Sequence, residues 1–139
     1  MKDAMMVRSL GPWSLALFAF LLCATPSLAQ QAEFPFDSEM FLDATPLPGS
    51  KRIPNIEIAG NGAIVLEMWC NRVEGQVVVA GDTITVMLGQ PAERSCTPEQ
   101  TDRDAELLKA MTETTNWRRE GDDLVLTGPR TLKFKEATH

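Results

Sequence analysis

The sequence predicts a small α+β domain that is mainly β: a strongly twisted antiparallel sheet of about seven strands, curled toward a partial barrel, with one amphipathic helix over residues 98–113 as a lid. Two observations predict this class. Short runs rich in Val, Ile and Thr alternate with Gly-Asp and Gly-Pro turn signals over most of the chain. A single segment interrupts that pattern with a helix start and an apolar stripe at helical spacing.

The strand prediction rests on alternation and on turn residues. Strand segments are predicted over 53–58, 63–69, 76–80, 83–88, 117–120, 124–127 and 131–135, with a short additional strand over 39–42. Pro54 cannot donate to a central ladder, so the segment that contains it is expected at a sheet edge. Ile64, Leu66 and Met68 recur at every second position and are expected to face the core.

The helix prediction rests on its first turn. Thr97 is a predicted N-cap, Pro98 suits the first turn, and Gln100 completes a capping box. The polar residues of this segment are expected to face water. The predicted apolar stripe consists of Ala105, Leu107, Leu108 and Met111.

Residues 1–29 have the features of a secretory signal peptide. Lys2 and Arg8 give a positive leader, and residues 13–24 are apolar except for one serine. That run is too short to span a bilayer as a stable helix. Small residues at the −3 and −1 positions predict cleavage after Ala29, and hence a secreted or periplasmic protein.

The exported chain is expected to have a flexible tail over residues 30–39 and one folded domain over residues 40–136. The formal net charge of −6 argues against nucleic acid and anionic membranes as partners. No later apolar run is long enough to cross a membrane, so we expect no stable membrane insertion after cleavage and a monomer in solution.

The predicted export guides the interpretation of the cysteines. Leu22 stands where lipoprotein processing requires a small residue before the modified cysteine, so lipidation of Cys23 is not expected. Cys70 and Cys96 form an even pair in an exported chain and predict one disulfide, with two buried thiols as the alternative. Closing a loop of about 26 residues contributes roughly 3.5 kcal/mol in the chain-entropy model, a large share of the stability of a small domain.

A series of short motifs follows a fixed order along the domain: C-N-R-x-x-G at 70–75, a Gly-Asp hairpin, R-x-C at 94–96, the helix, and then G-D-x-L-x-L and T-L-x-F. In this order and spacing they resemble the META domain family, the type represented by the heat-shock protein HslJ. The resemblance covers roughly residues 40–135. It implies a small β-rich fold, an exported or envelope-associated bacterial protein linked to stress tolerance, and no established enzymatic activity.

The motif residues Asn71, Arg72, Gly75 and Arg94 are the candidate site residues. In a functional interpretation, Asn71 and the two arginines form a recognition patch for a carboxylate, because guanidinium groups bind carboxylates bidentately. In the structural interpretation, which we favour, Asn71 bonds a turn backbone and the arginines pair with nearby acids. Those acids are Glu67, Glu74 and Glu93.

Catalysis has little material in this sequence. His139 is the only histidine and the last residue, so no histidine-based triad, general base or metal site is expected. Bridged cysteines provide no nucleophile. The acids at 104 and 106 and at 122 and 123 are assigned to a polar helix surface and a hairpin tip. We therefore expect no enzyme, no metal and no cofactor.

Trp69, Trp117 and Met68 are candidates for the lining of an apolar cavity, although filling the core of a small barrel is the interpretation we favour. The leading functional hypothesis is a non-enzymatic envelope protein that binds an unknown partner or small ligand in stress tolerance. The alternative is a secreted inhibitor of an envelope enzyme such as a protease or a lysozyme-like enzyme. A hydrolase or redox enzyme ranks last.

Overall fold

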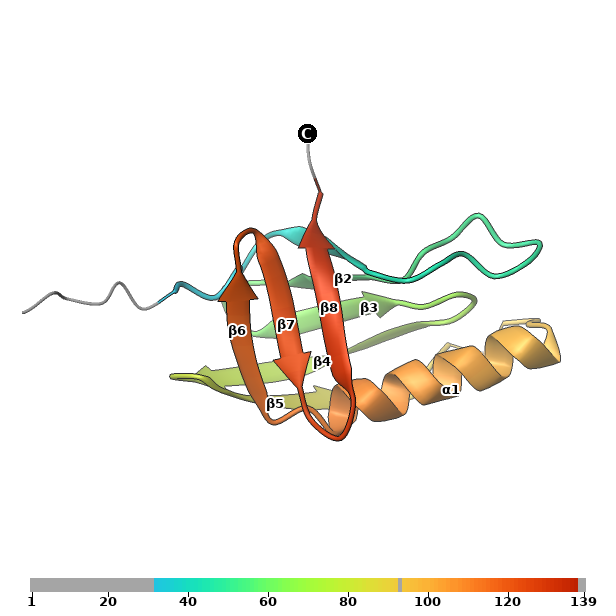
Figure 1. Cartoon of the computed structure of the whole chain (residues 1–139). Coiled ribbons are helices and arrows are strands. Elements are labelled where there is room, and N and C mark those ends of the chain that lie inside the picture. Colours follow the sequence, from blue (N-terminus) through green and yellow to red (C-terminus); the bar gives the residue numbers. More distant parts are fainter. Residues whose placement is uncertain (1–31, 93, 138–139) are drawn as a thin grey trace, which may run out of the picture. The chain divides into compact units, whose positions relative to one another are not determined.

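A computed structural model describes residues 32–92 and 94–137, in which eight strands and one helix follow one another along the chain (Figure 1). The strands before the helix are β1 (Glu39–Leu42), β2 (Asn55–Ile58), β3 (Ala63–Glu67), β4 (Arg72–Ala80) and β5 (Thr83–Leu88). The helix α1 (Pro98–Thr112) is followed by β6 (Asn116–Glu120), β7 (Asp123–Thr127) and β8 (Thr131–Glu136). The eight strands are the seven expected segments and the short additional strand over 39–42, so the count of about seven is one too low once that strand is included, and the helix ends one residue earlier than predicted.

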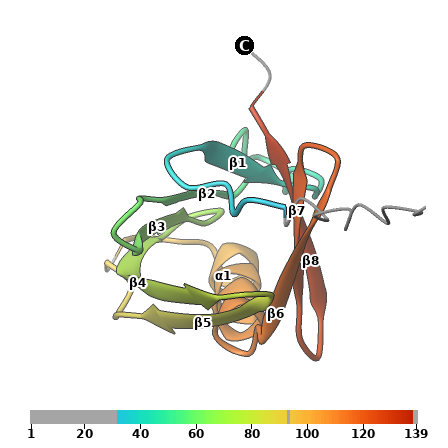
Figure 2. The ribbon, with the colours of Figure 1, turned by 90° about the vertical axis from the view of Figure 1, so that its left-hand side faces the viewer.

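The strands form a closed antiparallel barrel in which chain neighbours pair and β8 returns to β1. The seam between β5 and β6 is the weakest, because those strands share the single register pair Thr83↔Asn116. Helix α1 connects these two strands and packs against β5 and β8, as Figure 2 shows in a view nearly along its axis. The fold class is therefore confirmed, and the sheet closes more completely than the partial barrel that was predicted.

The helix begins as predicted. The Thr97 hydroxyl accepts a hydrogen bond from the Gln100 N–H, and the Gln100 side chain accepts one from the Thr97 N–H. The buried face of α1 differs from the predicted stripe. Ala105 is exposed and Asp104 is buried, and the other buried residues of the helix are Leu107, Ala110 and Met111.

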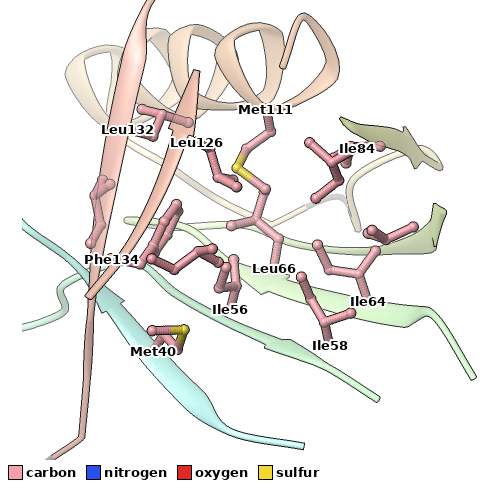
Figure 3. Packing of buried hydrophobic residues seen from close by; sticks show 14 of the residues in the cluster. Met40, Ile56, Ile58, Ile64, Leu66, Ile84, Met111, Leu126, Leu132 and Phe134 are labelled. Carbon is pink, nitrogen blue, oxygen red and sulfur yellow. The ribbon is translucent and has the colours of Figure 1, made fainter. Parts of the chain in front are cut away.

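The barrel interior is filled by alternate residues of the strands. Ile64, Leu66 and Met68 are almost fully buried, which confirms the predicted inner face of the third strand. Figure 3 shows Met111 of α1 pointing into the barrel toward side chains that come from both halves of the sheet. The helix therefore contributes to the same hydrophobic core as the strands and is more than an external cover.

The expected flexible tail over 30–39 is wrong for the residues that the structure describes. Phe34 is only 6% exposed and packs edge to face on Trp117, with ring centroids 5.0 Å apart. Glu39 already belongs to β1. A tail cannot be distinguished from packed chain by composition when the contact partner lies far along the sequence.

The expected edge position of the second strand is also wrong. β2 pairs with β1 on one side and β3 on the other. Pro54 lies just before the first residue of β2, so its missing N–H removes no ladder bond within the strand. Its carbonyl accepts a hydrogen bond from the Leu42 N–H at 2.8 Å.

Candidate functional site

The disulfide joins two segments that are far apart in the sequence. The sulfur atoms of Cys70 and Cys96 are bonded, which links the connection between β3 and β4 to the residue just before the N-cap of α1. The bridge is not fully buried, and the Cys70 sulfur lies 3.8 Å from the Ser95 carbonyl oxygen. The start of the helix is therefore covalently fixed to the barrel at one end.

A buried carboxylate fixes the same junction. Asp104 of α1 is 4% exposed, and its Oδ2 accepts a hydrogen bond of 2.7 Å from the Asn71 N–H. Both carboxylate oxygens also lie 3.3 Å from the Cys70 nitrogen. Asp104, assigned from the sequence to a polar helix surface, instead satisfies the backbone donors of the residues at the disulfide. We call Cys70, Asn71, Cys96 and Asp104 the clasp.

The motif arginines act within this framework. Arg72 forms ion pairs with Glu67 at 3.4 Å and with Glu74 at 2.8 Å, two of the acids named by the structural interpretation. Arg94 donates to the Cys70 carbonyl oxygen at 3.4 Å. Neighbouring acids and a carbonyl therefore already engage both guanidinium groups.

Gly75 is required by the packing of adjacent strands. A Cβ atom at this position would overlap the carbonyl oxygen of Met87 on β5. Asn71 participates through its backbone, since its N–H donates to Asp104 and its carbonyl accepts from Met68. Its side-chain Oδ1 is buried with no hydrogen-bond partner among the described residues, so the predicted side-chain bond to a turn is not observed.

The three residues considered for a cavity have different positions. Met68 is fully buried in the core, and Trp117 is 9% exposed, with its indole N–H donating to the Gly81 carbonyl at 2.8 Å. Trp69 is only partly buried and lines a surface cleft. Its indole nitrogen is itself buried and has no partner in the described part of the chain.

The cleft lies beside the clasp, where the β1–β2 loop, the β3–β4 connection, the start of β8 and one face of α1 come together. Its volume is about 320 Å³, and a narrower extension of about 50 Å³ continues along the helix. Apolar side chains make up much of the wall: Leu42, Leu47, Trp69, Leu107, Ala110 and Leu132. The charged residues of the lining are Asp43, Arg103, Glu106, Arg130 and Lys133.

Two of these charges are already engaged away from the cleft. The Lys133 ammonium lies 2.9 Å from Asp123 and 3.6 Å from Glu120, and the hydrogen bond to Asp123 raises the pKa of Lys133 above its ordinary value. Asp43 pairs with Lys135 at 3.0 Å. The charges left to the cleft are those of the two arginines and Glu106.

The acids of the described residues do not gather into a metal site. Over residues 32–92 and 94–137, no three His, Cys, Asp or Glu side chains are grouped so that they could hold a metal ion. The paired acids considered from the sequence separate in space and role, because Asp104 is buried in the clasp and Glu106 is exposed near two arginines. Within the described residues, no helix has the length and apolar character needed to span a membrane.

Sequence reasoning missed the cleft and the role of Asp104. Asp104 lies three residues before Leu107 and seven before Met111, so it shares their helix face, and that spacing was the available signal. The cleft had no comparable signal, because its walls come from segments that only the tertiary fold brings together.

Comparisons with known proteins agree with the fold. A family model for the META domain matches residues 35–139. An NMR structure of a protein from Burkholderia xenovorans has a TM-score of 0.59 at 19% identity, covering 83% of this chain and 98% of that one. A second NMR structure has a TM-score of 0.57 at 19% identity, covering 71% of this chain and 88% of that one. These likenesses concern the fold alone, and among curated proteins no significant match is found. Because the family model spans nearly the whole of the described domain, this chain belongs to the META domain family.

Proposed function

We propose that this protein is an exported, non-catalytic META domain that binds a partner or small ligand of the bacterial envelope through the cleft beside the clasp. The cleft carries the proposal: it has a volume of about 320 Å³, apolar side chains over much of its wall, and a few charged groups among its lining residues. Ligand sites in proteins are concave and mostly apolar, with a small number of polar groups that orient the ligand. The role in stress tolerance follows from the family resemblance.

The clasp supports a binding role because it makes the walls of the cleft rigid. Trp69 precedes Cys70 directly, and Arg103 precedes Asp104, so two lining residues are neighbours of clasp residues. The disulfide and the Asp104 hydrogen bonds hold these neighbours at a fixed separation. Sites on such supported elements keep their geometry better than sites on unrestrained loops.

Export and the absence of catalysis are parts of the same proposal. A structural disulfide persists in oxidising compartments, which favours a periplasmic or secreted protein. The leader at 1–29 lies outside the described residues, and its cleavage is tested by the intact mass of the exported protein, which should begin at Gln30. With both cysteines bridged, thiol titration of that protein after denaturation should find no free thiol.

A second candidate function is inhibition of an envelope enzyme. Val78 and Met87 are the exposed large hydrophobic side chains of the described chain, at 52% and 50% exposure, and they project from the adjacent strands β4 and β5. An exposed apolar pair on a rigid hairpin suits contact with another protein. This surface lies on different elements from those that form the cleft.

One pull-down from envelope extract distinguishes the two functions. Thr45 lines the cleft and is exposed, so Thr45→Trp should fill the cleft without disturbing the core. Thr85 is exposed on β5 opposite Val78, so Thr85→Trp should block the hairpin surface. Loss of the captured molecule with Thr45→Trp alone supports the cleft. If the wild type instead captures a protease or lysozyme-like enzyme stoichiometrically and Thr85→Trp alone loses it, the result supports inhibition and contradicts the cleft proposal.

A further inference from the structure

Two arginines approach the cleft from different elements. Arg103 is on α1 and Arg130 is in the turn between β7 and β8, and both line the main cleft and its narrow extension. Both point at the same acid, because their Nη1 atoms lie 3.6 Å and 3.8 Å from Oε2 of Glu106. Among the described residues, no other acid lies within 4.0 Å of either guanidinium group.

This arrangement leaves the cleft with one positive charge in excess. Glu106 supplies one carboxylate for two guanidinium groups, while Asp43 and Lys133 are paired with residues outside the cleft. The distances to Glu106 are ion-pair distances longer than a hydrogen bond, and the side chains are at least half exposed. Each guanidinium has five N–H donors, so donors remain for a second acceptor. A local positive charge in a chain of net charge −6 selects for an anion.

The rest of the cleft is suited to an apolar body. Leu42, Leu47 and Leu132 line it from the barrel side, and Leu107 lines the narrow extension from the helix. Trp69 lines both parts, and its buried indole N–H lacks a partner in the described structure. The leucines and the indole face form the apolar part of the wall, and this part can accept an aliphatic chain.

From these contacts we infer that the cleft binds a small aliphatic carboxylic acid, with its carboxylate held between Arg103 and Arg130 and its chain along the leucines. This inference rests on the proposed binding function of the same cleft and names its ligand class. A monoanion matches the single excess charge, and planar guanidinium groups match the carboxylate geometry. A phosphate monoester carries a charge of about −1.5 to −2 at neutral pH and would exceed that charge next to Glu106.

Titration of the ¹⁵N-labelled protein with octanoate tests the inference. The expected result is a saturable shift of the Trp69 indole N–H signal with no shift of the Trp117 indole, whose N–H is bonded to the Gly81 carbonyl. Octylamine and octanol, which have the same chain length, should bind at least about tenfold more weakly.

Variants at the charged groups should move the affinity in opposite directions. Arg103→Gln with Arg130→Gln should weaken octanoate binding at least about tenfold, whereas Arg118→Gln, on β6 outside the cleft, should leave it unchanged. Glu106→Gln should strengthen binding about two- to fivefold, because it removes the competing carboxylate. A merely disrupted cleft would not produce that gain.

The inference is overturned if octanoate does not bind saturably, if octanol binds equally well, or if the double arginine variant binds octanoate like the wild type. Tighter binding of octyl phosphate than of octanoate would overturn the carboxylate assignment. If octanoate does not bind but the wild type captures a molecule from envelope extract that Thr45→Trp does not capture, this ligand class is refuted and the binding function is retained. Failure of both would refute the proposed function as well.

Discussion

Replacing Asp104 by alanine tests whether the clasp stabilises the domain as its geometry indicates. The carboxylate is 4% exposed and accepts hydrogen bonds from the backbone N–H groups of Asn71, at 2.7 Å, and Cys70, at 3.3 Å. Hydrogen bonds to a charged group contribute about 1.5–3 kcal/mol each, and the longer of these two contacts should lie below that range. We expect Asp104→Ala to lower the free energy of unfolding by about 3 kcal/mol.

Asp104→Asn separates shape from charge. The amide retains one oxygen acceptor for the short bond to Asn71 but turns a donor toward the Cys70 N–H, so a loss of about 1.5 kcal/mol is expected. The measurement is urea unfolding followed by tryptophan fluorescence with the disulfide intact, compared at equal m-values. Asp102→Ala is the matched control, because Asp102 is exposed on the same helix and should change stability by less than about 0.5 kcal/mol.

Two outcomes would refute this reasoning. If Asp104→Ala stays within about 0.5 kcal/mol of the wild type, the carboxylate contacts contribute nothing that water does not replace. If Asp104→Asn is more stable than the wild type, burying the charge costs more than its hydrogen bonds return. Combining Asp104→Ala with removal of the bridge should give a non-additive loss, because both restrain the same junction.

Three further changes test the contributions of the disulfide, of the β4–β5 contact and of the N-terminal segment to stability, by the same unfolding measurement. Replacing Cys70 and Cys96 together by serine should cost about 3.5 kcal/mol for a sequence separation of 26, and a loss below about 1 kcal/mol would contradict the entropic account. Gly75→Ala should cost about 2 kcal/mol because the new Cβ meets the Met87 carbonyl; an unchanged midpoint would show that the strands separate freely. Phe34→Ala should lower the free energy of unfolding by about 3 kcal/mol, and a loss below about 0.5 kcal/mol would support the flexible tail that the sequence predicts.

The elements that could be predicted are those whose signal is local. Alternation over residues 63–69 marked the inner face of β3 because a strand repeats every two residues, and Thr97 with Gln100 marked the helix start because capping needs only adjacent residues. The disulfide could be predicted from the even number of cysteines in the exported chain, without any geometric information.

What could not be predicted depends on contacts between distant segments. The burial of Phe34 requires Trp117, which lies more than eighty residues further along the chain, so its own neighbourhood contains no sign of it. Asp104 was misplaced because polar residues on helices usually face solvent, and only the approach of the Cys70 backbone gives this one a partner. The cleft forms where four segments of the chain meet and has no sequence pattern of its own.

The arginines of the motif and those of the cleft differ in the groups that they pair with. Arg72 pairs with two glutamates of β3 and β4, and Arg94 donates to the Cys70 carbonyl oxygen, so the motif arginines offer little to a ligand. Arg103 and Arg130 share one exposed carboxylate at the cleft and remain able to bind an anion. Because none of the clasp hydrogen bonds described above involves these two side chains, we expect substitutions at both positions to leave the fold intact. Under the proposed binding function, ligand preference should therefore depend on positions 103 and 130, and stability on the clasp.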